Sequence, residues 1–106
     1  MAPRELPPAY PRLPTNVEAA GGPVIVKLRT AKVMAEDKEV WGSWDESSRT
    51  IELDARVHPR HQWRVFFHEL MHATLADAGL ENLFPEPTVE ALCDAVATAR
   101  MREKFG

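Results

Sequence analysis

The sequence has little cysteine and no long hydrophobic run. Cys93 is the only cysteine among 106 residues, so no internal disulfide can form, which is typical of a reducing compartment. No stretch approaches the roughly 20 apolar residues that cross a bilayer. The opening residues, Met1 to Pro8, contain no apolar segment of the kind found in secretory signals. We therefore expect a cytoplasmic protein without a membrane partner.

Positive charge is also scarce. The formal net charge is −3, and the residues from Val33 onward carry eight Lys and Arg against fourteen Asp and Glu. An acidic body of this kind is unsuited to binding phosphates, which excludes a general nucleic-acid partner. Hydrophobic residues at 44% and charged residues at 27% are ordinary values for a globular protein, and the length suits one domain.

Proline is concentrated at one end of the chain. Residues 1–23 hold six of the nine prolines, and such a segment cannot form a regular hydrogen-bond ladder. We interpret residues 1–23 as a proline-rich arm, which lies on the domain or projects from it, and residues 24–106 as the single folded domain. The arm could cover a functional cleft or recruit a partner, and its composition does not separate these cases.

Three segments after the arm are typical of β-strands, namely residues 24–30, 39–44 and 49–54. A polar turn at 45–48 joins the second and third segments and predicts a hairpin. In the third segment, Ile51 and Leu53 share one face while polar residues occupy the other, so we expect one buried and one solvated face.

The spacing of apolar residues then changes from two to three or four. This spacing predicts an amphipathic helix over 60–78, with Pro59 in its first turn and Gly79 at its end. A second helix is expected over 88–104, capped by Thr88. About three strands followed by two helices make a small α+β domain with an antiparallel or mixed sheet.

The first predicted helix contains a motif that carries chemistry, His68-Glu69-Leu70-Met71-His72. Two histidines four residues apart project from one face of a helix, so both imidazoles can reach one Zn²⁺ ion. Glu69 is placed to take a proton from a water that the metal activates. The alternative is a surface histidine pair, which the apolar flanks and the preceding hairpin disfavour.

A third ligand is expected from a different element, because a catalytic zinc usually keeps three protein ligands and one open position. The second helix offers Glu90, and Asp94 lies one turn further on the same face, where it can orient one histidine by accepting its ring N–H. The alternative for Glu90 is an ordinary glutamate in the first turn of a helix, favoured by the helix dipole. Two imidazoles and a carboxylate also suit Co, Ni or Fe.

His68-Glu69-x-x-His72 followed by Glu90-x-x-x-Asp94 resembles the pattern of the gluzincins, zincin metallopeptidases with a glutamate ligand on a later helix. Within this group, the small size of the domain and the sequence from Trp41 to Leu53 are similar to those of the minigluzincins and the ImmA/IrrE-like metallopeptidases. The resemblance covers residues 40–98. It implies a zincin-like fold, with a small sheet, an active-site helix behind it and a glutamate-bearing helix alongside.

The resemblance also implies that an edge strand binds extended peptide by strand addition, for which Trp41, Gly42, Ser43 and Trp44 are the candidate residues. Core packing is the alternative for the tryptophans. One departure is that larger gluzincins carry an oxyanion-stabilising Tyr, His or Arg beyond the glutamate helix, and the sequence has none there. His61 and Arg64 are expected on the face of His68, one or two turns away.

The leading hypothesis is thus a zinc-dependent metallopeptidase that hydrolyses peptide bonds in a protein or peptide substrate, with Glu69 as general base. The alternative is a catalytically weak or inactive regulatory module that binds metal on a zincin-like fold. Cys93 lies three residues after Glu90, and a small buried hydrophobe is the favoured interpretation over a thiolate ligand.

Overall fold

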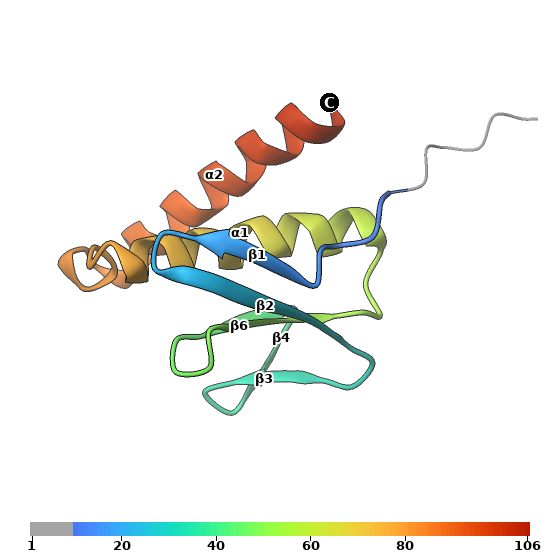
Figure 1. Ribbon diagram of the computed structural model, residues 1–106, viewed down its shortest axis with the longest axis horizontal. Coiled ribbons are helices and arrows are strands. Elements are labelled where there is room, and N and C mark those ends of the chain that lie inside the picture. Colours follow the sequence, from blue (N-terminus) through green and yellow to red (C-terminus); the bar gives the residue numbers. More distant parts are fainter. Residues whose placement is uncertain (1–9) are drawn as a thin grey trace, which may run out of the picture.

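The structure, a computed structural model, describes residues 10–106 and contains strands before two long helices. A mixed sheet followed by two helices confirms the α+β class (Figure 1). In chain order the elements are β1 (Asn16–Ala19), β2 (Gly22–Arg29), β3 (Val33–Ala35), β4 (Lys38–Val40), β5 (Gly42–Asp45), β6 (Thr50–Asp54), α1 (Pro59–Asp77), the 3₁₀ turn η1 (Glu81–Leu83) and α2 (Glu86–Phe105).

The main sheet has four strands in the order β1-β2-β6-β5. The pairs β1–β2 and β5–β6 are antiparallel, whereas β2 and β6 are parallel, with Ile25 opposite Thr50. Strands β3 and β4 form a separate hairpin. Its turn residues Glu36 and Asp37 both have positive φ, 50° and 62°, which is the backbone of a tight hairpin turn. In this arrangement β5 is an edge strand of the main sheet.

Helix α1 lies between the sheet and α2, so the molecule has three layers (Figure 1). It begins at Pro59, where the His58 side chain accepts a hydrogen bond from the Arg60 N–H at 3.1 Å, and it ends before Gly79, whose φ is +71°. The expected boundaries of this helix are therefore confirmed. The main core is formed by apolar residues of the inner sheet strands and both helices: Val24, Val26, Ile51, Leu53, Trp63, Phe66, Phe67, Ala97 and Met101.

The outer face of β6 is less exposed to solvent than the sequence predicted. Thr50 and Asp54 are both buried, although they lie on the face opposite Ile51 and Leu53. Their polar atoms are satisfied locally: the Thr50 hydroxyl donates to the Ser48 carbonyl at 3.1 Å, and Asp54 accepts from Arg56. The Arg56 side chain and backbone hold the pKa of Asp54 down at about 2. Partnered polar groups can be buried at little cost, so the alternation rule fails at this strand.

Three boundaries differ from the sequence-based expectations. The expected arm contains β1, because the proline-free segment Asn16–Ala19 pairs with the start of β2 and adds a strand to the sheet. The expected strand over 39–44 is divided at Trp41 into β4 and β5. Helix α2 begins at Glu86 after the N-cap Pro85, two residues before Thr88. A proline in the first turn is tolerated there because its missing N–H has no partner in a helix anyway.

A partly buried ion pair holds the end of α1 against two turns of the sheet. Arg49, the last residue of the β5–β6 turn, donates to both oxygens of Asp77 at 2.7 and 3.0 Å and to the Gly22 carbonyl at 3.1 Å. Asp77 also accepts from the Gly21 N–H at 2.8 Å, and only 7% of its side chain is exposed. The hydrogen bonds from Arg49 and Gly21 lower the pKa of Asp77 to about 2. The orientation of α1 on the sheet is therefore set at its C-terminal end.

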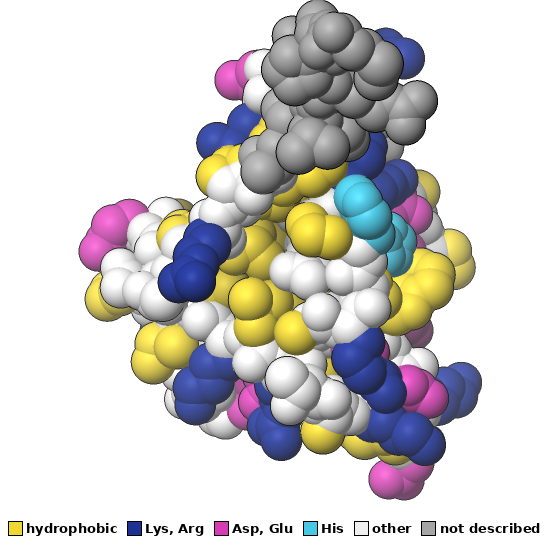
Figure 2. All heavy atoms as spheres, turned by 90° about the vertical axis from the view of Figure 1, so that its right-hand side faces the viewer, with side chains coloured by type: hydrophobic (Ala, Val, Ile, Leu, Met, Phe, Trp, Pro, Cys, Tyr) yellow, Lys and Arg dark blue, Asp and Glu magenta, His cyan; other side chains and the backbone are white. Residues whose placement is uncertain are grey.

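No helix in the described part of the chain is long and apolar enough to cross a membrane. The face on the right-hand side of Figure 1 carries Lys and Arg side chains mixed with acidic and hydrophobic ones (Figure 2). Its positive charges therefore do not form a single basic surface.

Candidate metal centre

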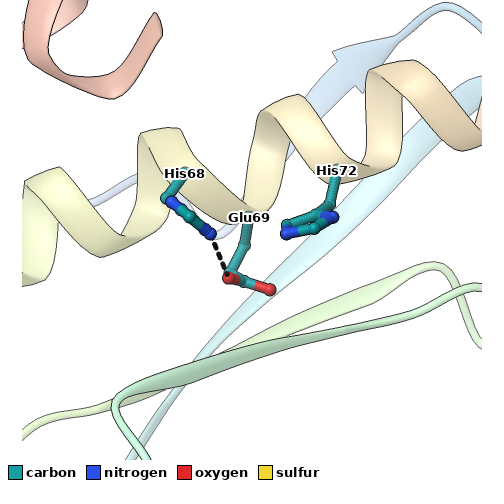
Figure 3. Close-up of side chains that lie close together, drawn as sticks. All are labelled: His68, Glu69 and His72. Carbon is teal, nitrogen blue, oxygen red and sulfur yellow. Dashed lines mark ion pairs between the residues drawn. The ribbon is translucent and has the colours of Figure 1, made fainter. Parts of the chain in front are cut away.

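Helix α1 presents His68, Glu69 and His72 on one side, toward the sheet layer (Figure 3). The two imidazole centroids are 5.0 Å apart, and the Glu69 carboxylate lies 3.9 Å from Nε2 of His68. One ligand atom from each residue lies within 4.8 Å of the others, so the three could hold a metal ion. The helical rise explains this convergence, since residues four apart lie one turn above each other.

Helix α2 brings Glu90 to the same point. One oxygen of Glu90 lies 3.0 Å from Nε2 of His68 and the other lies 2.9 Å from Nε2 of His72. The two Nε2 atoms and this carboxylate therefore face one another across the α1–α2 interface. Two imidazoles and one carboxylate are a donor set that zinc accepts, so the residues present fit the expected metal.

Each histidine also has a carboxylate at its other ring nitrogen. Asp94, one turn after Glu90 on α2, lies 2.8 Å from Nδ1 of His68. Glu81, the first residue of η1, lies 3.3 Å from Nδ1 of His72. Carboxylates at this position fix the tautomer and the ring orientation of a histidine ligand. Sequence reasoning missed Glu81 because it follows a loop, where no periodicity relates it to His72.

Glu69 differs from the other acidic residues of this cluster because it is buried, with only 9% of the residue exposed. Burial raises the pKa of its carboxyl group, while the neighbouring His72 and His68 oppose that shift. A carboxylate of raised pKa beside two imidazoles is a suitable proton acceptor.

The cluster opens into a cleft of about 750 Å³. Strand β5 and the β3–β4 hairpin form one wall, η1 and the first half of α2 form the other, and α1 lies between them. All four residues of the candidate peptide-binding strand line this cleft, Trp41, Gly42, Ser43 and Trp44. His61 and Arg64 of α1 line it as well, on the approach to His68.

Gly42 explains how closely β5 approaches α1. A Cβ atom there would collide with Cγ1 of Val65 and would lie 2.9 Å from Cδ2 of Leu53. The close approach therefore requires a residue without a side chain at this point of the strand. As a result the edge of β5 runs beside the helix that carries His68 and His72.

Neither the described part of the arm nor Cys93 belongs to the cleft. Among the described residues, none before Ala35 lines it, and Tyr10 instead packs against Phe105 with 5.0 Å between the ring centroids. Cys93 is fully buried beside Leu75, and burial raises the pKa of its thiol to about 12. A thiol of this kind stays protonated and acts as a small hydrophobic side chain.

Comparison with known proteins gives one match. The family model described as IrrE N-terminal-like domain (Peptidase_M78) matches residues 24–105, which includes every residue of the cluster and of the cleft. No curated protein and no solved structure matches.

Proposed function

This chain belongs to the family of IrrE N-terminal-like domains, and from that premise we propose that it is a zinc-dependent peptidase. The proposal assigns His68, His72 and Glu90 as the metal ligands and Asp94 as the group that orients His68. The observation that carries it is that the Nε2 atoms of His68 and His72 each lie within 3.0 Å of a carboxylate oxygen of Glu90, at the side of a cleft.

The buried carboxylate of Glu69 acts as the general base in this proposal. Zinc bound by the two histidines and Glu90 would supply Lewis-acid chemistry, lowering the pKa of water and polarising a carbonyl. Glu69 accepts the proton of the attacking water and returns it to the leaving amine. Asp94 holds the imidazole of His68 through Nδ1, which leaves Nε2 free to face the metal.

The peptide substrate is proposed to bind along β5. The Trp41 carbonyl accepts the Asp54 N–H at 2.8 Å, and the register pairs Ser43 with Glu52. Backbone groups alternate between the two sides of an antiparallel strand, so those of Gly42 and Trp44 face the free edge. An extended peptide can pair with these groups by strand addition, which places its backbone beside the histidines of α1.

Metal content tests the proposal directly. Protein purified without added metal is expected to contain about one zinc per chain, and Glu90→Ala should contain much less, because two imidazoles alone leave the ion without its carboxylate ligand. Elemental analysis measures both. Glu86→Ala is the matched control, because it removes a glutamate one turn earlier on α2 and should leave the zinc in place. A wild-type protein that takes up no metal, even when zinc is offered, would contradict the proposal.

The contact between Glu81 and His72 leads to a second prediction. Glu81→Leu should weaken zinc binding by about 10- to 100-fold, which is the usual cost of losing a group that orients a metal ligand. Glu81→Gln should lose less, because its amide oxygen can still accept the ring N–H. Competition with a chromophoric zinc chelator measures the affinity, with Glu86→Leu as control. Equal affinities for the Glu81→Leu and wild-type proteins would show that Glu81 only neighbours the site.

A further inference from the structure

The cleft has an aromatic corner that the metal centre does not use. Trp41, directly before β5, packs edge-on against the imidazole of His61 on α1, with 4.4 Å between the ring centroids and an 85° angle between the ring planes. Val40 and Val65 line the cleft in the same region. The corner therefore combines the two elements that also form the peptide-binding edge and the metal-binding helix.

Neither aromatic side chain is explained by core packing or by hydrogen bonding. Trp41 is 59% exposed, although a tryptophan side chain offers a large apolar area for burial. Nε2 of His61 is shielded from solvent and has no hydrogen-bond partner among residues 10–106. An exposed tryptophan in the wall of a concave site is a common anchor for a ligand.

The spacing of this corner and the metal centre along α1 corresponds to about three residues of an extended peptide. His61 precedes His68 by seven residues on α1, which corresponds to about 10 Å along the helix axis. An extended chain advances about 3.3 Å per residue. A peptide paired with β5 and cleaved beside His68 would therefore place a side chain at Trp41 about three residues from the cleaved bond.

We propose that Trp41 and His61 form a subsite for an aromatic or large aliphatic side chain, located about three residues from the scissile bond of an extended peptide. This inference rests on the proposed peptidase function and specifies its substrate class. The occupant follows from the lining of the corner, since Trp41, Val40 and Val65 offer apolar contact. It also follows from continuity with β5, which fixes the path of the peptide. Glu81 and Glu86, in contrast, lie on the opposite wall.

Cleavage of a peptide series tests the subsite. The peptides place Phe or Ala at each position up to four residues on either side of one cleavable bond. Wild-type protein should prefer Phe about three residues away, by about 10- to 100-fold in kcat/KM. In Trp41→Ala the ratio of kcat/KM for the Phe peptide to that for the Ala peptide should fall to near one. Trp41→Phe should keep part of the preference. Leu83→Ala is the control, because Leu83 is 69% exposed and lies outside the cleft.

The outcomes separate the subsite from the peptidase function. The subsite proposal is wrong if the wild-type protein cleaves Phe and Ala peptides equally well. It is also wrong if Trp41→Ala lowers kcat/KM by the same factor for both peptides. Either result leaves the peptidase proposal standing. If no peptide is cleaved, the subsite is tested by calorimetry, which measures how tightly the same peptides bind to the zinc-loaded wild-type and Trp41→Ala proteins. Tighter binding of the Phe peptide that Trp41→Ala abolishes supports the subsite although the peptidase proposal fails, and equal binding of Phe and Ala peptides overturns it.

Discussion

Glu69→Gln is expected to lower peptide turnover by about 10²- to 10⁴-fold while leaving the zinc in place. Glutamine has the shape of glutamate and fits the same buried position, but its amide cannot accept the proton of the attacking water. The metal is held through His68, His72 and Glu90 in the proposed site, so its content should not change. Single-turnover cleavage of a fluorogenic peptide and elemental analysis on the same sample measure both quantities.

Glu86→Gln is the matched control for this experiment. It makes the same chemical change at another glutamate of the cleft, one that is exposed in the first turn of α2. Its turnover should stay near the parental value. If Glu69→Gln cleaves as fast as the wild-type protein, Glu69 is not the base and the mechanism proposed for this site is wrong.

The second large effect concerns stability. Leu53→Ala should lower the free energy of unfolding by about 2–5 kcal/mol, because it opens a cavity that a packed core cannot refill. Leu53 is fully buried on β6, between β2 and β5 and beneath α1. Small domains are stable by only about 5–15 kcal/mol, so this loss is a large fraction of the total.

Urea unfolding followed by circular dichroism measures this loss, with metal removed from both proteins because a bound ion would add its own stabilisation. Leu83→Ala removes the same side chain from an exposed position of η1 and should change the free energy by less than about 0.5 kcal/mol. Equal midpoints for the two variants would contradict the assignment of Leu53 to the core.

Much of the helical half of the molecule could be predicted from the sequence, because its signals are local. The spacing of apolar residues from Trp63 onward, with Pro59 before and Gly79 after, gave the bounds of α1 within one residue. The spacing of the two histidines likewise placed both imidazoles on one face. Only helix geometry was needed for these predictions, and helix geometry depends on near neighbours in sequence.

The parts that were missed depend on distant partners. The residues of β1 form a strand only because they pair with β2, and nothing in their own sequence indicates that pairing. The division at Trp41 follows from the separate pairing of β4 with β3 and of β5 with β6. Glu81 reaches His72 only because the loop after α1 turns back toward it. Pairing partners and loop paths are set by tertiary packing, which no local pattern of residues encodes.

The parallel pairing of β2 with β6 also bears on the order of folding. Ile25 can pair with Thr50 only after the intervening segment, which contains β3, β4 and β5, has closed into a loop. Closing this loop lowers the conformational entropy of the chain before the stabilising contacts between β2 and β6 form. The α1–α2 pair and the β5–β6 hairpin instead join neighbours along the chain. We therefore expect the α1–α2 contacts, which bring the two histidines and Glu90 together, to form before the parallel β2–β6 pairing that completes the sheet.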